Sequence, residues 1–157
     1  MKIGFTGTAK GMTGSQRLAL AHGLQAFDPT EAHHGDCVGA DTEFHNLIRQ
    51  LFPQAKIVGH PGFPESDSRR ANNSCDEVRP IPNGGPLKRN RNIVDEVDFM
   101  FATPLQDNEV LRSGTWSTVR YAGRPNVNRP LMIIWPDGAV ENRGEFDQVS
   151  QIGHFIR

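Results

Sequence analysis

Residues 2–16, KIGFTGTAKGMTGSQ, decide the fold class of this chain. A short apolar strand is predicted over residues 2–6, and it runs through a loop of Gly, Thr and Lys into a helix. Thr13, with Gln16 three residues later, forms a capping-box pattern that predicts where the helix begins. A glycine-rich turn at this place brings backbone N–H groups and a helix dipole close to a bound anion. The stretch predicts a phosphate-type cradle, with a tight turn that holds no ligand as the alternative.

The rest of the chain repeats the alternation of strand and helix. Further strands are predicted at 31–35, 56–60, 98–103 and 131–135, and helices lie between them, the last over 113–122. Pro86 suits the first turn of the helix before residue 98. Residues 61–85 lack periodicity and are predicted to form a long loop, whereas the tail after residue 138 adds either a strand or a short helix. This order predicts an α/β fold with a mostly parallel sheet, in one domain over residues 1–157.

Composition excludes several classes of function. The net charge is −1 and the isoelectric point about 6.6, which argues against general binding of nucleic acid. The N-terminus has no apolar run typical of a signal peptide, and no stretch approaches the ~20 apolar residues that span a bilayer. Two cysteines do not make a disulfide framework. We therefore expect a cytoplasmic protein that does not interact with membranes.

Ligands of parallel sheets bind beyond the carboxyl ends of the strands, so the loops there are the candidate site. The first loop supplies Gly7, Thr8 and Lys10. It lacks the ending of a Walker loop and is not a clean GxGxxG motif. The loop nevertheless offers hydroxyl, ammonium and backbone donors to a phosphate group.

The second loop, GDCVGAD at 35–41, places two carboxylates near the same edge. Asp36 is predicted to bind ribose hydroxyls, whereas Asp41 either caps its helix or contacts the ligand. Cys37 is interpreted as a small buried residue rather than a nucleophile. His33 and His34 precede the loop, but adjacent strand residues point to opposite faces, and no second pair has zinc-like spacing. The sequence thus predicts no metal and no cofactor.

Two later segments add cationic and N–H donors. Arg89 and Arg91 stand in the sequence KRNRN, which is either a solvated basic face or a phosphate contact. Gly114 and Thr115 stand at the start of the last helix and predict a second anion-binding helix end. Trp116 either stacks on a base or closes the core.

Taken in order, the motifs GFTGT, KGMT, HHGDCVGAD, RNRNIVDEVDFMFATP and SGTWSTVRYA resemble the SLOG superfamily of Rossmann-like nucleotide-binding proteins. This superfamily includes LONELY GUY phosphoribohydrolases, molybdenum-cofactor carrier proteins and the DNA-processing protein A family. The resemblance covers residues 2–137. It implies a Rossmann-like domain, a nucleotide-derived ligand and a homodimer or other homo-oligomer.

The resemblance also assigns individual positions. Gly7 and Thr8 match the family's first glycine loop, where many relatives have an arginine at the position of Ala9. Asp36, Gly39 and Asp41 match its second element, and Arg89 stands at the position of a phosphoribohydrolase arginine.

The family's catalytic motif is matched less completely. Gly114 and Thr115 match its Gly-Thr pair, but Thr118 occupies the catalytic glutamate position. An N-glycosidic hydrolase needs a carboxylate at the sugar carbon, so Asp41 and Glu109 are the candidates to supply it. Three hypotheses follow. The first is a protein that senses, carries or sequesters a nucleotide-like ligand, and the second is a hydrolase of nucleoside monophosphates. The third is a structural or protein-interaction domain with a vestigial pocket.

Overall fold

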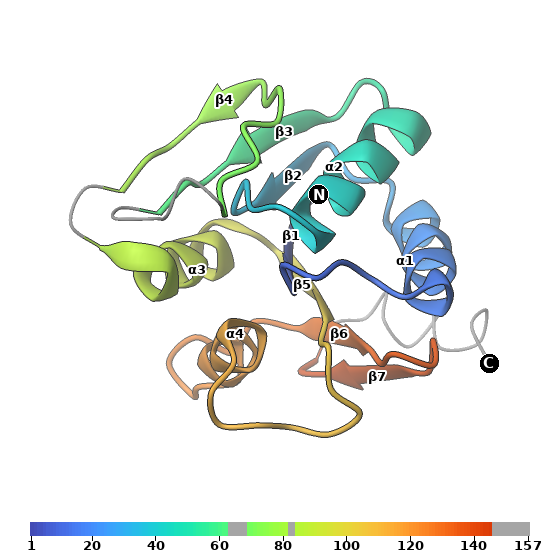
Figure 1. Ribbon diagram of the computed structural model, residues 1–157, viewed down its shortest axis with the longest axis vertical. Helices are drawn as coiled ribbons and strands as arrows, with labels where there is room; N and C mark the ends of the chain where they lie inside the picture. Colours follow the sequence, from blue (N-terminus) through green and yellow to red (C-terminus); the bar gives the residue numbers. More distant parts are fainter. Residues whose placement is uncertain (63–68, 82–83, 146–157) are drawn as a thin grey trace.

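The computed structural model describes residues 1–62, 69–81 and 84–145. Seven strands in this part of the chain form one sheet, flanked by four helices (Figure 1). The strands are β1 (Lys2–Gly7), β2 (Glu31–His34), β3 (Lys56–Gly59), β4 (Glu77–Val78), β5 (Phe99–Thr103), β6 (Leu131–Ile134) and β7 (Val140–Arg143). The helices are α1 (Gly14–Phe27), α2 (Ala40–Leu51), α3 (Gly85–Glu96) and α4 (Gly114–Ala122). The predicted α/β class is confirmed.

Strand order places the functional edge of the sheet. The order is β4-β3-β2-β1-β5-β6-β7, with all neighbouring pairs parallel except β6 and β7. The chain builds outward from β1 in one direction and then restarts at β5 on its other side. This reversal between β1 and β5 is a topological switch point, where the loops leave in opposite directions and open a crevice.

Both faces of the sheet are buried, and alternate residues of each strand serve opposite layers. Phe99 and Phe101 of β5 belong to the cluster that packs under α1 and α2. Met100 and Ala102 belong to the cluster under α3 and α4. Figure 1 shows the two helix pairs on opposite sides of the sheet. This arrangement explains why the central strands are apolar throughout rather than alternating.

The structure corrects one local prediction and decides two that the sequence left open. Residues 61–85 contain β4, which pairs with β3, so the segment is not only a loop. The first residues after the Asp137–Gly138 turn form the antiparallel strand β7, while the tail beyond residue 145 lies outside the described residues. Helix α2 has Gly39 at its N-cap with no side-chain capping hydrogen bond, so Asp41 does not cap it. The Thr13–Gln16 capping box of α1 is confirmed.

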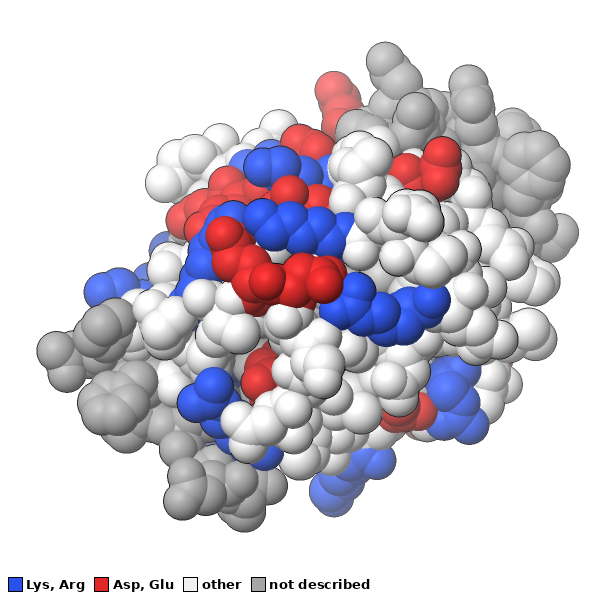
Figure 2. All heavy atoms as spheres, turned by 90° about the horizontal axis from the view of Figure 1, so that it is seen from above, with Lys and Arg blue, Asp and Glu red and all other residues white. Residues whose placement is uncertain are grey.

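Charged side chains protect the outer part of the sheet. Glu77 of β4 pairs with Lys56 at 3.5 Å and also with Arg79, and Arg49 pairs with Asp76 at 2.9 Å. Figure 2, seen from the top of the view in Figure 1, shows acidic and basic side chains interleaved on this face. Paired charges along an edge strand discourage pairing with a second chain. The described residues of this face form no continuous basic surface.

Gly39 is required by the close approach of two loops. Its φ is +85°, and a Cβ there would lie 2.3 Å from the carbonyl oxygen of Ala9. We expect Gly39→Ala to lower the free energy of unfolding by about 2–4 kcal/mol, measured by urea denaturation. Gly85→Ala is the matched control, because Gly85 also has a positive φ, +66°, but a Cβ there would meet nothing within 4 Å. Equal losses in the two variants would show that the contact with Ala9 is unimportant.

Candidate functional site

A pocket of about 330 Å³ lies at the carboxyl edge of the sheet, where the loops after the paired strands β1 and β5 separate. Its walls come from the loops that follow β1, β2 and β5 and from the starts of α3 and α4. The lining residues include Thr6, Gly7, Thr8, Lys10, Cys37, Asp41, Arg69, Arg89, Asn90, Gln106, Arg112, Ser113, Gly114 and Thr115. The position is the one that the topology predicts for a ligand.

The loop after β1 is held in shape by its own backbone. The carbonyl oxygen of Thr8 accepts hydrogen bonds from Gly11 N at 3.1 Å and from Ala40 N at 3.0 Å. Thr8 Oγ1 accepts from Lys10 N at 3.2 Å. The first bond closes the turn, and the second ties it to the start of α2. The wall of the pocket is therefore formed before a ligand arrives.

The opposite wall is the N-terminus of α4. Ser113 is the N-cap, and its Oγ accepts from Trp116 N at 3.3 Å. The N–H groups of the first helical turn have no acceptor within their own helix, and those of Gly114 and Thr115 lie in the part of the helix that lines the pocket. A helix N-terminus favours anions through these groups and through the dipole.

Arg89 fixes the base of the pocket. Its guanidinium is buried, and NH1 donates to the carbonyl oxygens of Gly35 at 2.6 Å and His60 at 2.9 Å. Nε donates to Asn90 Oδ1 at 2.7 Å. One side chain thus joins α3 to the segments that follow β2 and β3. Its positive charge remains within the wall of the site.

Asp41 is a buried carboxylate that also lines the pocket. Its Oδ2 accepts from Cys37 N at 3.1 Å. Burial raises the pKa of Asp41 to about 6, although the neighbouring charge of Arg89 acts in the opposite direction. Desolvation outweighs the attraction here, so the carboxyl exchanges its proton in the weakly acidic range.

The structure brings seven of the predicted site residues together in the described lining of the pocket. They are Gly7, Thr8, Lys10, Asp41, Arg89, Gly114 and Thr115. They come from four separate segments, and the sheet edge gathers them as the position of the loops predicts.

Four predicted ligand contacts lie elsewhere: Asp36, Gly39, Arg91 and Trp116. Asp36 is outside the described lining, and its Oδ1 accepts from Asn73 N at 2.8 Å and from Asn73 Nδ2 at 3.0 Å. Gly39 is outside the described lining and lies against the backbone of Ala9, where it allows the loops after β1 and β2 to approach each other. Arg91 is exposed, with its guanidinium carbon 5.3 Å from the centre of the Tyr121 ring.

Trp116, a predicted ligand contact, and Glu109, a predicted catalytic carboxylate, interact with other side chains of the protein instead. Trp116 is fully buried in the cluster under α3 and α4, with its ring 5.4 Å from that of Trp135. Glu109 pairs with Arg120 at 3.1 Å on an exposed part of the loop. Thr118, at the position of the family's catalytic glutamate, donates from Oγ1 to the carbonyl oxygen of Gly114 at 2.8 Å.

Among the polar residues that line the pocket, sequence reasoning did not identify Arg69, Asn90, Gln106 or Arg112. Arg112 directly precedes the Ser-Gly-Thr start of α4, and that adjacency is a signal that the sequence contains. Arg69 lies in the long segment after β3, and nothing local marks it. The described lining therefore has four basic side chains, Lys10, Arg69, Arg89 and Arg112. Its single carboxylate is that of Asp41.

Comparison with known proteins supports the fold and nothing finer. No family model matches the chain, and no curated protein matches it. Among solved structures, it resembles the molybdenum cofactor binding protein from the phototrophic bacterium Rippkaea orientalis, with a TM-score of 0.62 and 17% sequence identity. The match covers 99% of this chain and 83% of that one. In the described part of the chain, none of the helices has the length and apolar character needed to span a bilayer.

Proposed function

We propose that this protein binds a nucleotide or a nucleotide-derived ligand and serves to sense, carry or sequester it. The observation that carries the proposal is the convergence of a helix N-terminus and four basic side chains on one pocket at the switch point of the sheet. Helix N–H groups and guanidinium donors are the usual protein partners of phosphate oxygens. The phosphate group would lie between the loop after β1 and the start of α4.

The side chains divide into fixed and adaptable contacts. Arg89 is buried and held by backbone carbonyls, so it contributes a preorganised charge. Lys10, Arg69 and Arg112 are exposed, and their side chains can close on an anion as it enters.

Gln106 is the candidate contact for the part of the ligand beyond the phosphate group. Its Oε1 is buried, and among the described residues it has no hydrogen-bond partner. Buried polar atoms normally have partners, and because Gln106 lines the pocket, a rotation of its side chain would bring this acceptor to a donor of the ligand. The amide would accept from a sugar hydroxyl, the contact that the sequence analysis assigned to Asp36, or from an exocyclic amine.

The second candidate function is hydrolysis of an N-glycosidic bond, and Asp41 is the observation that favours it. A carboxyl with a pKa of about 6 can serve as an acid or a base near neutral pH. Glu109 is less suited, because it pairs with Arg120 and is outside the described lining of the pocket. In this alternative the same residues bind the ligand, and Asp41 acts at the sugar carbon.

One incubation separates the candidates. Purified protein is mixed with a panel of nucleotides and the molybdenum cofactor, and both the retained ligands and the free products are identified by mass spectrometry. Retention of one intact compound is the expected result. Release of free base with ribose phosphate would support the hydrolase, and that activity should disappear in Asp41→Asn. If the protein retains no compound and releases no product, the proposal is contradicted.

Gly114 offers a sharp test of the phosphate position. A Cβ at Gly114 would meet only Asn90 Nδ2, at 3.9 Å, so Gly114→Ala should fold normally. The added methyl group would occupy the space beside the helix N–H groups, and we expect affinity for the retained ligand to fall by about tenfold, near 1.4 kcal/mol. Gly123→Ala, at the other end of α4, is the matched control, because its nearest contacts are 3.7 and 3.8 Å. Calorimetric titration of both variants measures the difference, and equal affinities would place the phosphate elsewhere.

A further inference from the structure

Outside the pocket, two clusters of histidines lie back to back across the sheet. His33 and His34 are neighbours on β2, so their rings face opposite sides. His33 meets His60 and Glu96, whereas His34 meets His45 and Cys75. The prediction that the two histidines would not share one site agrees with this arrangement. Each cluster brings three potential metal ligands within 4.8 Å of one another.

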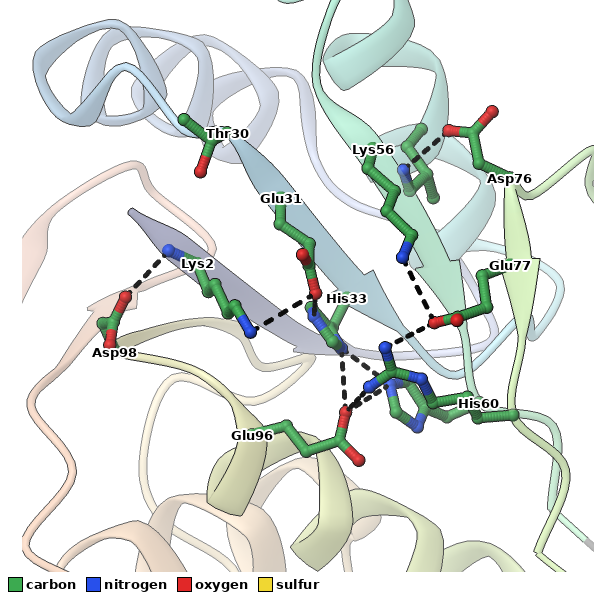
Figure 3. A network of polar contacts seen from close by, with 12 residues as sticks. Lys2, Thr30, Glu31, His33, Lys56, His60, Asp76, Glu77, Glu96 and Asp98 are labelled. Atoms are coloured by element: carbon green, nitrogen blue, oxygen red, sulfur yellow. Dashed lines mark hydrogen bonds and ion pairs between the residues drawn. The ribbon is translucent and has the colours of Figure 1, made fainter.

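The His33 cluster has the geometry of a three-ligand metal site (Figure 3). His33 Nδ1 lies 2.7 Å from His60 Nε2 and 3.6 Å from Glu96 Oε2, and His60 Nε2 lies 3.8 Å from the same oxygen. A tetrahedral ion with bonds of about 2.0–2.2 Å holds its ligand atoms roughly 3.3–3.5 Å apart. Two separations are already close to that range, and the two rings need to part by roughly 0.6 Å.

Hydrogen bonding fixes which nitrogen of His33 is available. His33 Nε2 lies 2.7 Å from Glu31 Oε1, a carboxylate acceptor, so Nε2 carries the proton. Nδ1 then presents its lone pair toward His60 and Glu96. A carboxylate behind a histidine is the usual support of a metal-binding imidazole, because it sets the tautomer and raises the basicity of the ligand atom.

The same reasoning rejects the His34 cluster. The backbone N–H of Asp36 donates to His34 Nδ1 at 2.9 Å, so Nδ1 is the acceptor and Nε2 carries the proton. It is Nε2 that faces His45, at 2.9 Å, and Cys75, at 3.8 Å. The backbone N–H can only donate, so it holds the proton of His34 on Nε2, and burial raises the pKa of the Cys75 thiol to about 11. This cluster is therefore a hydrogen-bonded part of the core.

We propose that His33 Nδ1, His60 Nε2 and Glu96 Oε2 bind one divalent transition-metal ion of the Zn²⁺ class. Two imidazoles and a carboxylate are a ligand set that zinc accepts, with water at the remaining position. His33 and His60 are buried and Glu96 is partly exposed, so the ion enters beside Glu96. On binding, the proton that His60 Nε2 donates to His33 in the unloaded site moves to His60 Nδ1, so the ring stays neutral. This inference is independent of the proposed function.

Arg79 competes with a metal ion for Glu96 at the entrance to the site. Its guanidinium forms ion pairs with both Glu96 and Glu77. An incoming cation must displace it from Glu96, after which Glu77 remains as its partner. Arg79 thus lowers affinity for the metal, and its removal should tighten binding.

The ion would connect elements that also build the pocket. Glu96 and Arg89 are seven residues apart on α3, which is close to two helical turns. Arg89 donates to the carbonyl oxygen of His60, the same residue whose ring binds the ion. A metal at this place would tie together β2, the end of β3 and α3 beneath the pocket.

Titration of the full chain with Zn²⁺ alone tests the proposal. Protein freed of metal with a chelator is titrated by calorimetry, and its thermal midpoint is measured with and without the ion. We expect saturation at one equivalent and a higher midpoint. Glu31→Gln should weaken binding by about 10–100-fold, Glu96→Gln by more, and Arg79→Gln should strengthen it. Cys75→Ser is the control in the other cluster and should leave affinity unchanged.

Substitution with Co²⁺ identifies the ligands independently of variant stability. A spectrum without thiolate-to-metal charge transfer is expected, because the proposed site contains no sulfur. A thiolate band, or loss of affinity in Cys75→Ser, would move the ion to the other cluster and overturn the proposal. Unchanged affinity in Glu96→Gln, or no saturable binding of Zn²⁺, would do so as well.

Discussion

Arg89→Met is expected to lower the free energy of unfolding by about 3–5 kcal/mol and to abolish binding of the ligand. The methionine fills most of the volume, but the carbonyl oxygens of Gly35 and His60 lose their donor, and the buried carboxylate of Asp41 loses a neighbouring positive charge. Leaving buried polar groups unsatisfied costs more than the net value of the bonds that are lost. Urea denaturation at neutral pH measures the effect.

Arg91→Met is the matched control for this experiment. It makes the same substitution two residues away on α3, where the side chain is exposed over Tyr121. We expect its unfolding free energy to change by about 0.5–1 kcal/mol at most. Similar losses in the two variants would mean that the effect comes from helix propensity or from total charge, and the structural role assigned to Arg89 would then be incorrect.

Acidification should destabilise the protein strongly between pH 6.5 and about pH 3. Burial lowers the pKa of His34 to about 3 and that of His60 to about 3, from an ordinary value of 6.5. In this window the two histidines are protonated in the unfolded chain but stay neutral in the folded chain, so the free energy of unfolding falls as pH decreases. Each histidine contributes on the order of a few kcal/mol. Urea denaturation across the window, with a chelator present, measures the slope.

The titration of Asp41 changes stability in the direction opposite to that of the histidines and provides an internal check. Its folded pKa, about 6, is raised above the ordinary value of 3.8, so the folded state holds the proton more readily. Its contribution to stability therefore decreases as pH rises through this range. Asp41→Asn should steepen the loss of stability on acidification, whereas His34→Gln should make it shallower. A slope that neither variant changes would contradict the assignment of buried neutral histidines.

The sequence predicted the fold well because its signals are local and periodic. The capping box at Thr13 and the apolar run of β6 each depend on a few adjacent residues. The long segment after β3 was harder to predict, because β4 is two residues long and exists only through its pairing with β3. A strand of that length has no periodicity of its own.

The site was predicted in part, for reasons that individual residues make clear. Gly114 and Thr115 are marked by the start of a helix, and topology carries them to the sheet edge. Arg69 lies in the pocket through the path of a loop that no local pattern encodes. The spacing of His33, His60 and Glu96 in the chain does not resemble a metal motif, because three separate elements bring them together.

The most direct test of the central claim is the position of the phosphate group. Crystals grown with the compound that the protein retains from the panel would locate it by electron density. We predict phosphate oxygens within hydrogen-bonding distance of the N–H groups of Gly114 and Thr115, with the loop at Thr8 on the other side. A ligand bound outside this pocket, or one whose phosphate points into solvent, would contradict the account.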